Sequence, residues 1–356
     1  MMCGRIERAV ASSHTEKPCG NTLPDVLAER EYATGSHVRE IPLTGRIERQ
    51  NMAMRSFARV MLAAASGLLL VTPGPAVAAP AGNVSHTRVP TLSAEPDGVR
   101  APFAELADGN TGAVRWSRQP NTRAPMGSIT KVMTALVVLE AGDLDRAVTV
   151  PRAIIAYDRK YDGSTAGLVP GEVLTARQLL YAMMLPSGCD AAYALAESYG
   201  PGQAAFIAEM NATAARLGLA NTHFTDPSGL PAPTGYSTYS TPADLVKLGL
   251  RAMSQPVFRD IVKTQTYHQP AGPANRDHVW RTTNPLLRDY PGTVGIKTGS
   301  TDAAGTCLLF ETVRAGQPLI GVVLHSSPTS DAAAEADARH MLDWGFGPIL
   351  SLIPIP

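Results

Sequence analysis

Residues 128–141 read SITKVMTALVVLEA, and the rest of the chain can be organised around them. Apolar residues recur from Ile129 onward at the spacing of one helix face, which predicts a helix buried on one side. Residues three apart on a helix lie one turn from each other, so the amine of Lys131 is expected to reach the hydroxyl of Ser128. Free N–H groups in a first helical turn favour a developing oxyanion. The stretch therefore suits a serine nucleophile with a lysine base beside it.

A serine three residues before a lysine is a weak pattern on its own. Ser128 is the only serine in this chain that has a lysine at that spacing. The plainer structural interpretation is a capping serine followed by a lysine whose stem lies along apolar surface. Motifs farther along the chain are needed to decide between the two.

The overall composition narrows the class of protein. The 356 residues carry 31 Lys and Arg against 31 Asp and Glu, and 44% of them are hydrophobic. Nucleic-acid binders are usually basic, so we expect no nucleic-acid partner. His223, His268, His278 and His325 lie outside any metal-ligand spacing, which argues against a metal site and against a histidine-based triad. We expect these histidines in loops or at the surface.

An export signal precedes the part of the chain that should fold. Two arginines, Arg55 and Arg59, stand before an apolar run over 60–72. Small residues at Ala76 and Ala78 suit cleavage after Ala78. The apolar run is too short to cross a bilayer as a permanent helix, so a cleavable signal is the better interpretation.

These features divide the N-terminal part into three segments. We expect 1–51 to be a disordered extension upstream of the true start, 52–78 to be the signal peptide, and 79–100 to be a linker rich in Pro and Ala. The mature protein would be secreted. It would retain Cys189 and Cys307, and an oxidising compartment would allow one disulfide between them.

Strand patterns stand at both ends of the mature chain and helix patterns in its middle. Strands are expected over 102–107, 113–117, 293–299, 306–313 and 319–324. Helices are expected over 128–138, 175–185, 189–199, 203–217, 241–253 and 331–344, whereas 144–173 and 254–273 are expected to be mostly loop. This order predicts an α/β (α+β) fold with one five-stranded antiparallel sheet completed by the two ends of the chain. Helices would lie on both faces, with an all-helical lobe inserted.

A second serine motif, Ser187-Gly188-Cys189, stands between two of these helices. A serine on such a turn is often only a helix cap. The next motif, Lys297-Thr298-Gly299-Ser300, lies on the first strand of the closing part of the sheet. Its lysine and hydroxyl groups suit a substrate carboxylate, and Gly299 leaves room for a substrate backbone to pair with the strand edge. A lone Lys-Thr-Gly is also a common surface turn.

Taken in order, the three motifs have more weight than each has alone. Ser-x-x-Lys, Ser-x-Asn and Lys-Thr-Gly form the signature of the penicillin-recognising serine acyl transferases, and this sequence resembles that superfamily. It is most similar to the D-alanyl-D-alanine carboxypeptidases, the low-molecular-weight penicillin-binding proteins. The resemblance also rests on 133–135, 284–287 and 295–296. We therefore expect a catalytic domain of the β-lactamase/DD-peptidase type over 101–348 and a short tail over 349–356.

The resemblance implies a substrate and a mechanism. The substrate would be a peptidoglycan stem peptide ending in D-Ala-D-Ala, β-lactams would inhibit, no cofactor would be used, and the enzyme would be associated with the cell wall. Ser128 would attack the carbonyl between the two D-alanines, Lys131 would take its proton, and Ser187 would relay a proton to the leaving D-alanine. The backbone N–H groups of Ser128 and Ser300 would form the oxyanion hole.

The remaining motif residues would contact the substrate, namely Cys189, Lys297, Thr298, Gly299 and Ser300. Cys189 departs from the family pattern, which has asparagine there, and a thiol is a poorer hydrogen-bonding partner than an amide. The substitution is either tolerated or lowers turnover. We favour tolerance because the serine and both lysines remain, and a penicillin-binding wall module without strong turnover is the alternative.

Two related activities are further alternatives. A class A β-lactamase needs a glutamate between the second and third motifs, and only Glu197 and Glu209 lie there, both on expected helices directly after the second motif. A D,D-endopeptidase would differ only in the shape of its cleft. Longer family members carry a second β-rich domain and an amphipathic membrane helix. Because the chain ends at Pro356, we expect no stable membrane anchor.

Overall fold

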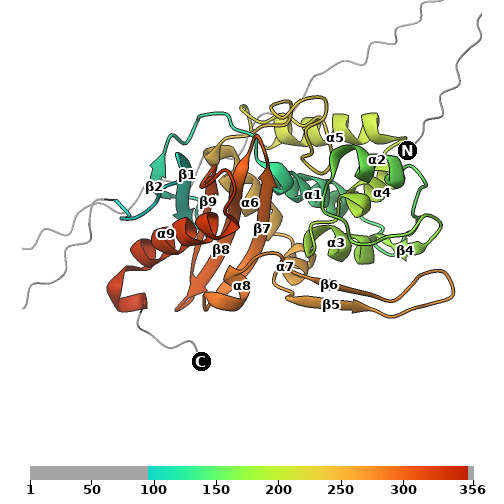
Figure 1. Ribbon diagram of the computed structural model, residues 1–356. Helices are drawn as coiled ribbons and strands as arrows, with labels where there is room; N and C mark the ends of the chain where they lie inside the picture. The colour runs from blue at the N-terminus through green and yellow to red at the C-terminus, as the bar shows by residue number, and fades with distance from the viewer. Residues whose placement is uncertain (1–94, 352–356) are drawn as a thin grey trace, which may run out of the picture. The chain divides into compact units, whose positions relative to one another are not determined.

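The computed structural model describes residues 95–351 (Figure 1). The predicted extension 1–51, the signal peptide 52–78, most of the linker 79–100 and most of the tail 349–356 lie outside the described residues.

A five-stranded antiparallel sheet forms one side of the described region, with the strand order β2-β1-β9-β8-β7. The strands are β1 (Phe103–Asp108), β2 (Val114–Arg118), β7 (Thr293–Thr301), β8 (Gly305–Arg314) and β9 (Gln317–Leu324). β1 pairs with β9, so strands from the two ends of the described chain meet inside the sheet. The predicted sheet is confirmed, and its strand ends differ from the predicted ones by at most two residues.

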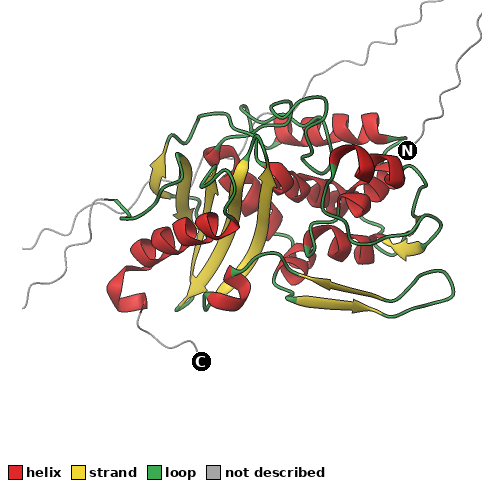
Figure 2. Cartoon of the chain, in the orientation of Figure 1, coloured by secondary structure: helices red, strands yellow, loops and turns green. Residues whose placement is uncertain are grey.

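Helices cover both faces of this sheet (Figure 2). Helix α9 (Asp331–Ser351) packs on one face, where Leu308 and Phe310 of β8 meet Met341. Their neighbours Cys307 and Leu309 belong to the larger core on the other face, because successive residues of a strand point to opposite sides. Helix α6 (Pro242–Met253) packs on that second face, as its contacts with β1, β8 and β9 show.

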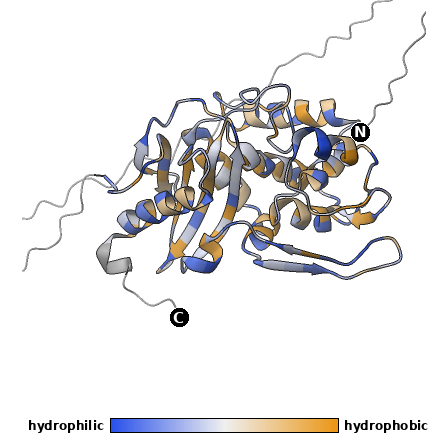
Figure 3. Ribbon diagram, in the orientation of Figure 1, coloured by the Kyte–Doolittle hydropathy of each residue, from blue (hydrophilic) through white to orange (hydrophobic). Residues whose placement is uncertain are grey.

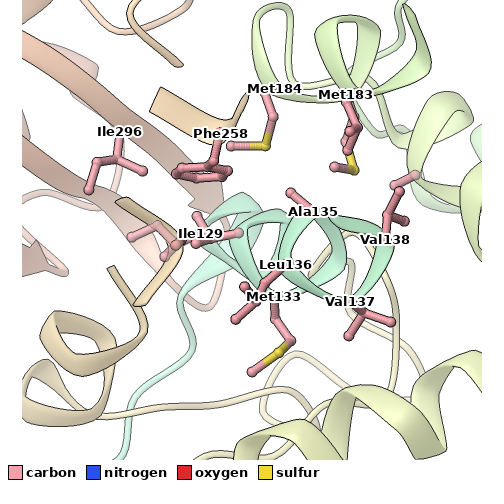
Figure 4. Packing of buried hydrophobic residues seen from close by; sticks show 14 of the residues in the cluster. Ile129, Met133, Ala135, Leu136, Val137, Val138, Met183, Met184, Phe258 and Ile296 are labelled. Atoms are coloured by element: carbon pink, nitrogen blue, oxygen red, sulfur yellow. The ribbon is translucent and has the colours of Figure 1, made fainter. Parts of the chain in front are cut away.

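Helix α1 (Lys131–Ala141) is the centre of the larger core. Residues 131–138 are all buried, so the prediction of a helix buried on one side only is wrong. The reason is that α1 lies between the sheet side of the molecule and a helical lobe. Figure 4 shows side chains leaving α1 in several directions, with Met183 and Met184 above it and Phe258 beside Ile129. The lobe contains α3 (Ala176–Met184), α4 (Cys189–Tyr199) and α5 (Gln203–Arg216).

Several short elements lie where the sequence predicts mostly loop or, over 274–292, where it predicts no helix or strand. They are β3 (Ala147–Thr149), α2 (Ile154–Tyr161), β4 (Val173–Thr175), α7 (Pro256–Val262), β5 (Thr266–Gln269), β6 (His278–Arg281) and α8 (Leu286–Asp289). Helix α2 buries only Ile154, and its apolar start is followed by a hydrophilic end (Figure 3), so it has no apolar periodicity to reveal it.

His278 corrects a second expectation. It lies on β6 and is buried, with Nε2 3.1 Å from Oε1 of the buried Glu172. Glu172 is more than 100 positions away in the sequence, so no local pattern announces the pair. His278 is therefore a buried structural histidine.

None of the helices within residues 95–351 has the length and apolar character needed to span a membrane.

Candidate active site

Ser128 lies in a 3₁₀ turn, Gly127–Thr130, that leads directly into α1. The sequence predicts the first turn of an α-helix there, and the observed turn is tighter. Residues three apart are eclipsed in a 3₁₀ helix, which brings Lys131 under Ser128. The Nζ atom of Lys131 lies 2.8 Å from the Oγ atom of Ser128, and the lysine side chain is completely buried.

Two more atoms surround the amine of Lys131. Its Nζ lies 3.1 Å from the carbonyl oxygen of Ser228 and 3.4 Å from the Sγ atom of Cys189. A neutral amine has two N–H groups and one lone pair. If the two N–H groups bind the carbonyl and the sulfur, the lone pair points at the hydroxyl of Ser128. The arrangement thus suits removal of the proton from that hydroxyl.

Ser187 lies in the short link between α3 and α4, with a backbone φ of 66°. This left-handed conformation costs a non-glycine residue about 1–2 kcal/mol, and such positions cluster at functional sites. Gly188 follows, where an added Cβ atom would lie 2.7 Å from the Cβ atom of Ala166. Helix α4 then begins at Cys189. The local conformation places both Ser187 and Cys189 in the wall of one cavity.

Strand β7 lies against the turn that carries Ser128. A Cβ atom on Gly127 would lie 2.8 Å from the backbone nitrogen of Ser300, and one on Gly299 would overlap the carbonyl oxygen of Met126. The two backbones therefore approach as closely as they do because both positions are glycine. This brings the backbone of Ser300 beside Ser128.

Lys297 belongs to β7 and is buried, with only 1% of its surface exposed. Its Nζ donates to the carbonyl oxygen of Thr298 at 3.1 Å. Burial, and then the nearby Lys131, hold the pKa of Lys297 well below its usual value, while Cys189 acts in the opposite direction. The hydroxyl of Thr298 faces the cavity region and lies 2.7 Å from that of Thr283.

One cavity of about 640 Å³ connects the three motifs. Ser128, Ser187, Cys189, Thr298, Gly299 and Ser300 all line it, while Lys131 and Lys297 lie buried behind this wall. The structure thus brings together all eight residues that the sequence singles out. It adds lining residues that no motif indicates, from the end of α2, from the loop after it and from the start of α9: Tyr161, Asp162, Gly163, Asp331 and Glu335.

Cys189 and Cys307 are both buried free thiols. The disulfide that an oxidising compartment would allow is therefore absent from the structure. The Sγ atom of Cys307 instead donates to the carbonyl oxygen of Ala304 at 3.5 Å, and burial raises the pKa of this thiol to about 12. Within residues 95–347, no group of three His, Cys, Asp or Glu side chains is arranged to hold a metal ion.

Comparison with known proteins identifies this arrangement. The profile of the peptidase S11 family, described as D-alanyl-D-alanine carboxypeptidase, matches residues 90–328. The chain belongs to the S11 D-alanyl-D-alanine carboxypeptidase family. It is therefore a serine-type DD-peptidase of the penicillin-binding group, as the three motifs predict.

Relatives of this S11 enzyme include carboxypeptidases and an endopeptidase. A D-alanyl-D-alanine carboxypeptidase of Streptomyces sp. (strain K15) is 42% identical over 251 residues, which are 67% of this chain and 84% of the relative. One from Mycobacterium tuberculosis is 39% identical over 247 residues, 68% of this chain and 80% of the relative. A D-alanyl-D-alanine endopeptidase of Escherichia coli is 32% identical over 267 residues, 73% of this chain and 82% of the relative.

The crystal structure of the Streptomyces K15 protein, there called a DD-transpeptidase, has a TM-score of 0.66 at 40% identity. The match covers 71% of this chain and 99% of that one. Solved variants of the K15 protein replace a cysteine by alanine or asparagine, and another replaces a serine two positions before it. That relative therefore contains the Ser-x-Cys spacing that Ser187 and Cys189 have here.

Proposed function

We propose that this S11 enzyme removes the terminal D-alanine from peptidoglycan stem peptides through an acyl-enzyme on Ser128. The observation that carries the proposal is the 2.8 Å contact between the buried amine of Lys131 and the hydroxyl of Ser128, at the wall of the cavity that the other motifs line. A carboxypeptidase must hold a free substrate carboxylate. The hydroxyls of Thr298 and Ser300 on the cavity wall, with Lys297 behind them, suit that task.

The steps follow from these positions. Ser128 attacks the carbonyl carbon between the two D-alanines while Lys131 takes the hydroxyl proton. The backbone N–H groups of Ser128 and Ser300 stabilise the oxyanion, at about 3–4 kcal/mol per donor. Ser187 relays a proton to the amine of the leaving D-alanine. Water then attacks the ester on Ser128, which releases the shortened peptide and restores the hydroxyl.

β-Lactams are proposed as inhibitors because release of the penicilloyl group from Ser128 would be slow. Glu335 is the only glutamate among the residues that line the cavity. It follows the third motif in sequence, and its carboxylate is held by Arg339 at 2.6 Å. Glu197 and Glu209 lie on α4 and α5, outside that lining. Among residues 95–351, no glutamate is thus placed as a class A β-lactamase would require.

We also propose that the enzyme works outside the cytoplasm, at the cell wall. The support is the signal-like segment 52–78 and the peptidoglycan substrate, which lies beyond the membrane. The catalytic domain would then be the region 101–348. Cys189 would contact the substrate where most of the family has asparagine.

The direct test measures D-alanine released from diacetyl-L-lysyl-D-alanyl-D-alanine by the purified chain and by its Ser128→Ala variant. Release that disappears in the variant is the expected result. If the chain is acylated by a fluorescent penicillin but releases no D-alanine, the carboxypeptidase proposal is wrong. A second candidate is then D,D-endopeptidase activity, favoured by the endopeptidase relative and tested with cross-linked muropeptides. A chain that neither labels nor hydrolyses would be a binding module.

A further inference from the structure

A turn outside the three motifs holds the amine of Lys131. The carbonyl oxygen of Ser228 accepts from Nζ at 3.1 Å, and Ser228 is fully buried. The preceding carbonyl, that of Pro227, accepts from the hydroxyl of Thr134 on α1 at 2.6 Å. The turn is therefore bound to α1 at two successive carbonyls. One of them touches the proposed base directly.

Asp226 fixes this turn from the inside. Its side chain is 3% exposed, and its Oδ1 atom accepts from the backbone N–H of Ser228 at 2.7 Å and from that of Leu230 at 3.0 Å. A carboxylate that binds two N–H groups of the same turn sets the direction of the peptide groups between them. The position of the Ser228 carbonyl thus depends on Asp226.

Tyr157 of α2 holds the other oxygen of this carboxylate. Its hydroxyl lies 2.7 Å from Oδ2 of Asp226 and 3.0 Å from Oγ of Ser228. A phenol has one hydrogen, so it donates to the carboxylate and accepts from the hydroxyl of Ser228. Burial, and then the charge of Asp226, raise the pKa of Tyr157 well above its usual value, which keeps it a donor.

The turn also has no room to move toward the nucleophile. Gly229 has a φ of 84°, and a Cβ atom there would overlap the carbonyl oxygen of Gly127, the residue before Ser128. It would also lie 2.5 Å from the hydroxyl of Thr130. The turn over 226–230 is thus packed directly against the 3₁₀ turn of the nucleophile.

Of the two groups that receive the N–H groups of Lys131, the carbonyl of Ser228 is the stronger acceptor, because a thiol sulfur is a weak one. The direction of the amine lone pair therefore depends mainly on that carbonyl. After proton transfer, the ammonium group donates to the same carbonyl and sulfur and to Oγ of Ser128, so no rearrangement is needed. A misplacement of about 1 Å in such a contact can cost about 100-fold in rate.

We propose that Asp226, held by Tyr157, is a positioning residue for catalysis: it fixes the carbonyl of Ser228, and this carbonyl aims the lone pair of Lys131 at the hydroxyl of Ser128. The proposal rests on the proposed role of Lys131 as the base. It assigns a catalytic positioning role to α2 and to the turn 226–230, neither of which belongs to the three motifs.

The test uses the full chain and a fluorescent penicillin, and it measures the acylation rate constant separately from the affinity of the non-covalent complex. Asp226→Ala should slow acylation by about 30- to 100-fold and leave the affinity within about threefold. The acylation rate constant of Asp226→Asn should stay within about fivefold of that of the original protein. Its Oδ1 can still accept both N–H groups, and its amide can donate to the oxygen of Tyr157.

Asp337→Ala is the matched control. Asp337 is also buried, at 2% exposure, and accepts two backbone N–H groups, those of Arg100 at 2.7 Å and Ala101 at 2.9 Å. It lies on α9, outside the cavity lining, so its loss should lower stability and leave the acylation rate unchanged. If Asp226→Ala does not fold, Tyr157→Phe replaces it, with an expected loss of about three- to tenfold.

The outcomes separate the two proposals. Three results would each overturn the positioning role. They are an acylation rate constant of Asp226→Ala equal to that of the original protein, an equal loss of this rate constant in Asp337→Ala, and a rate constant of Asp226→Asn as low as that of Asp226→Ala. If Tyr157→Phe is used in place of Asp226→Ala, an acylation rate constant equal to that of the original protein would also overturn the positioning role. Failure of the unchanged chain to be acylated would instead overturn the proposed function.

Discussion

The Nζ atom of Lys131 and the Oγ atom of Ser128 are 2.8 Å apart, and no part of the lysine side chain is exposed. The 3₁₀ turn creates this contact, because residues three apart are eclipsed in it. Burial comes from α1, which is enclosed by the sheet side and by the helical lobe. A base that water cannot reach must be oriented by protein groups alone.

Replacing Lys131 by methionine removes the amine and retains the length of the side chain. We expect acylation by penicillin to slow by about 10²- to 10⁴-fold, the usual contribution of a positioned base. The fold should persist, because an apolar side chain of similar size is often tolerated in place of a buried polar one. Thermal unfolding and a labelling time course check both statements. Lys247→Met, at a side chain that is 55% exposed, is the control, and equal labelling of both variants would contradict the role of Lys131.

Gly229→Ala should damage both stability and acylation. The residue has a φ of 84°, and the new Cβ atom would overlap the backbone of Gly127. Gly316→Ala is a matched control, because its φ is 75° and nothing lies within 4 Å of the added atom. Both variants bear the left-handed penalty of about 1–2 kcal/mol, and the overlap should cost Gly229→Ala about 1–3 kcal/mol more. Urea denaturation measures the difference, and equal losses would mean that the turn can move away.

Cys189→Ala should have a much smaller effect than Lys131→Met. The Sγ atom lies 3.4 Å from Nζ of Lys131, and sulfur is a weak acceptor. We therefore expect acylation to slow by no more than about tenfold, since a typical hydrogen bond contributes about 1 kcal/mol. A loss comparable with that of Lys131→Met would show that the thiol, rather than the carbonyl of Ser228, orients the amine. The labelling time course distinguishes the two.

The sheet and the three motifs could be predicted because their signals are local. Strand β8 alternates between its two faces, as Leu308 and Leu309 illustrate, and both faces are covered by helices. The contact between Ser128 and Lys131 follows from a spacing of three residues. These features need no knowledge of which distant segments meet.

The groups behind the nucleophile could not be predicted in this way. Tyr157 meets Asp226 across 69 positions of sequence, and it lies on a helix with a single buried apolar residue. His278 meets Glu172 across 106 positions. Such polar pairs are brought together by tertiary packing, and a tyrosine or histidine in a polar segment carries no sign of its partner.

Glu105 on β1 should make stability fall as the pH rises through the weakly acidic range. Burial raises the pKa of this carboxyl from 4.5 to about 6, with Lys247 opposing the rise and Asp244 adding to it. The folded protein then binds the proton more tightly than the unfolded chain does, so stability from this group is complete below pH 4.5 and is lost as the pH passes 6. Glu105→Gln removes the titration and should be more stable than the unchanged chain above pH 6, by about 1–2 kcal/mol.

Denaturant unfolding between pH 4 and 8 measures the difference in the free energy of unfolding between Glu105→Gln and the original protein. This difference should shrink toward pH 4. Asp108→Asn is a control of opposite sign. Hydrogen bonds from Arg115 and Thr111 hold the pKa of Asp108 below its usual value, so this carboxylate stabilises the fold at neutral pH and its loss should not help there. Because Glu105 is only 4% exposed, few water molecules can solvate its charged form. Removing the charge should therefore raise the free energy of unfolding at neutral pH. A difference in unfolding free energy that stays constant with pH would show that Glu105 is ionised to the same extent in the folded and the unfolded protein.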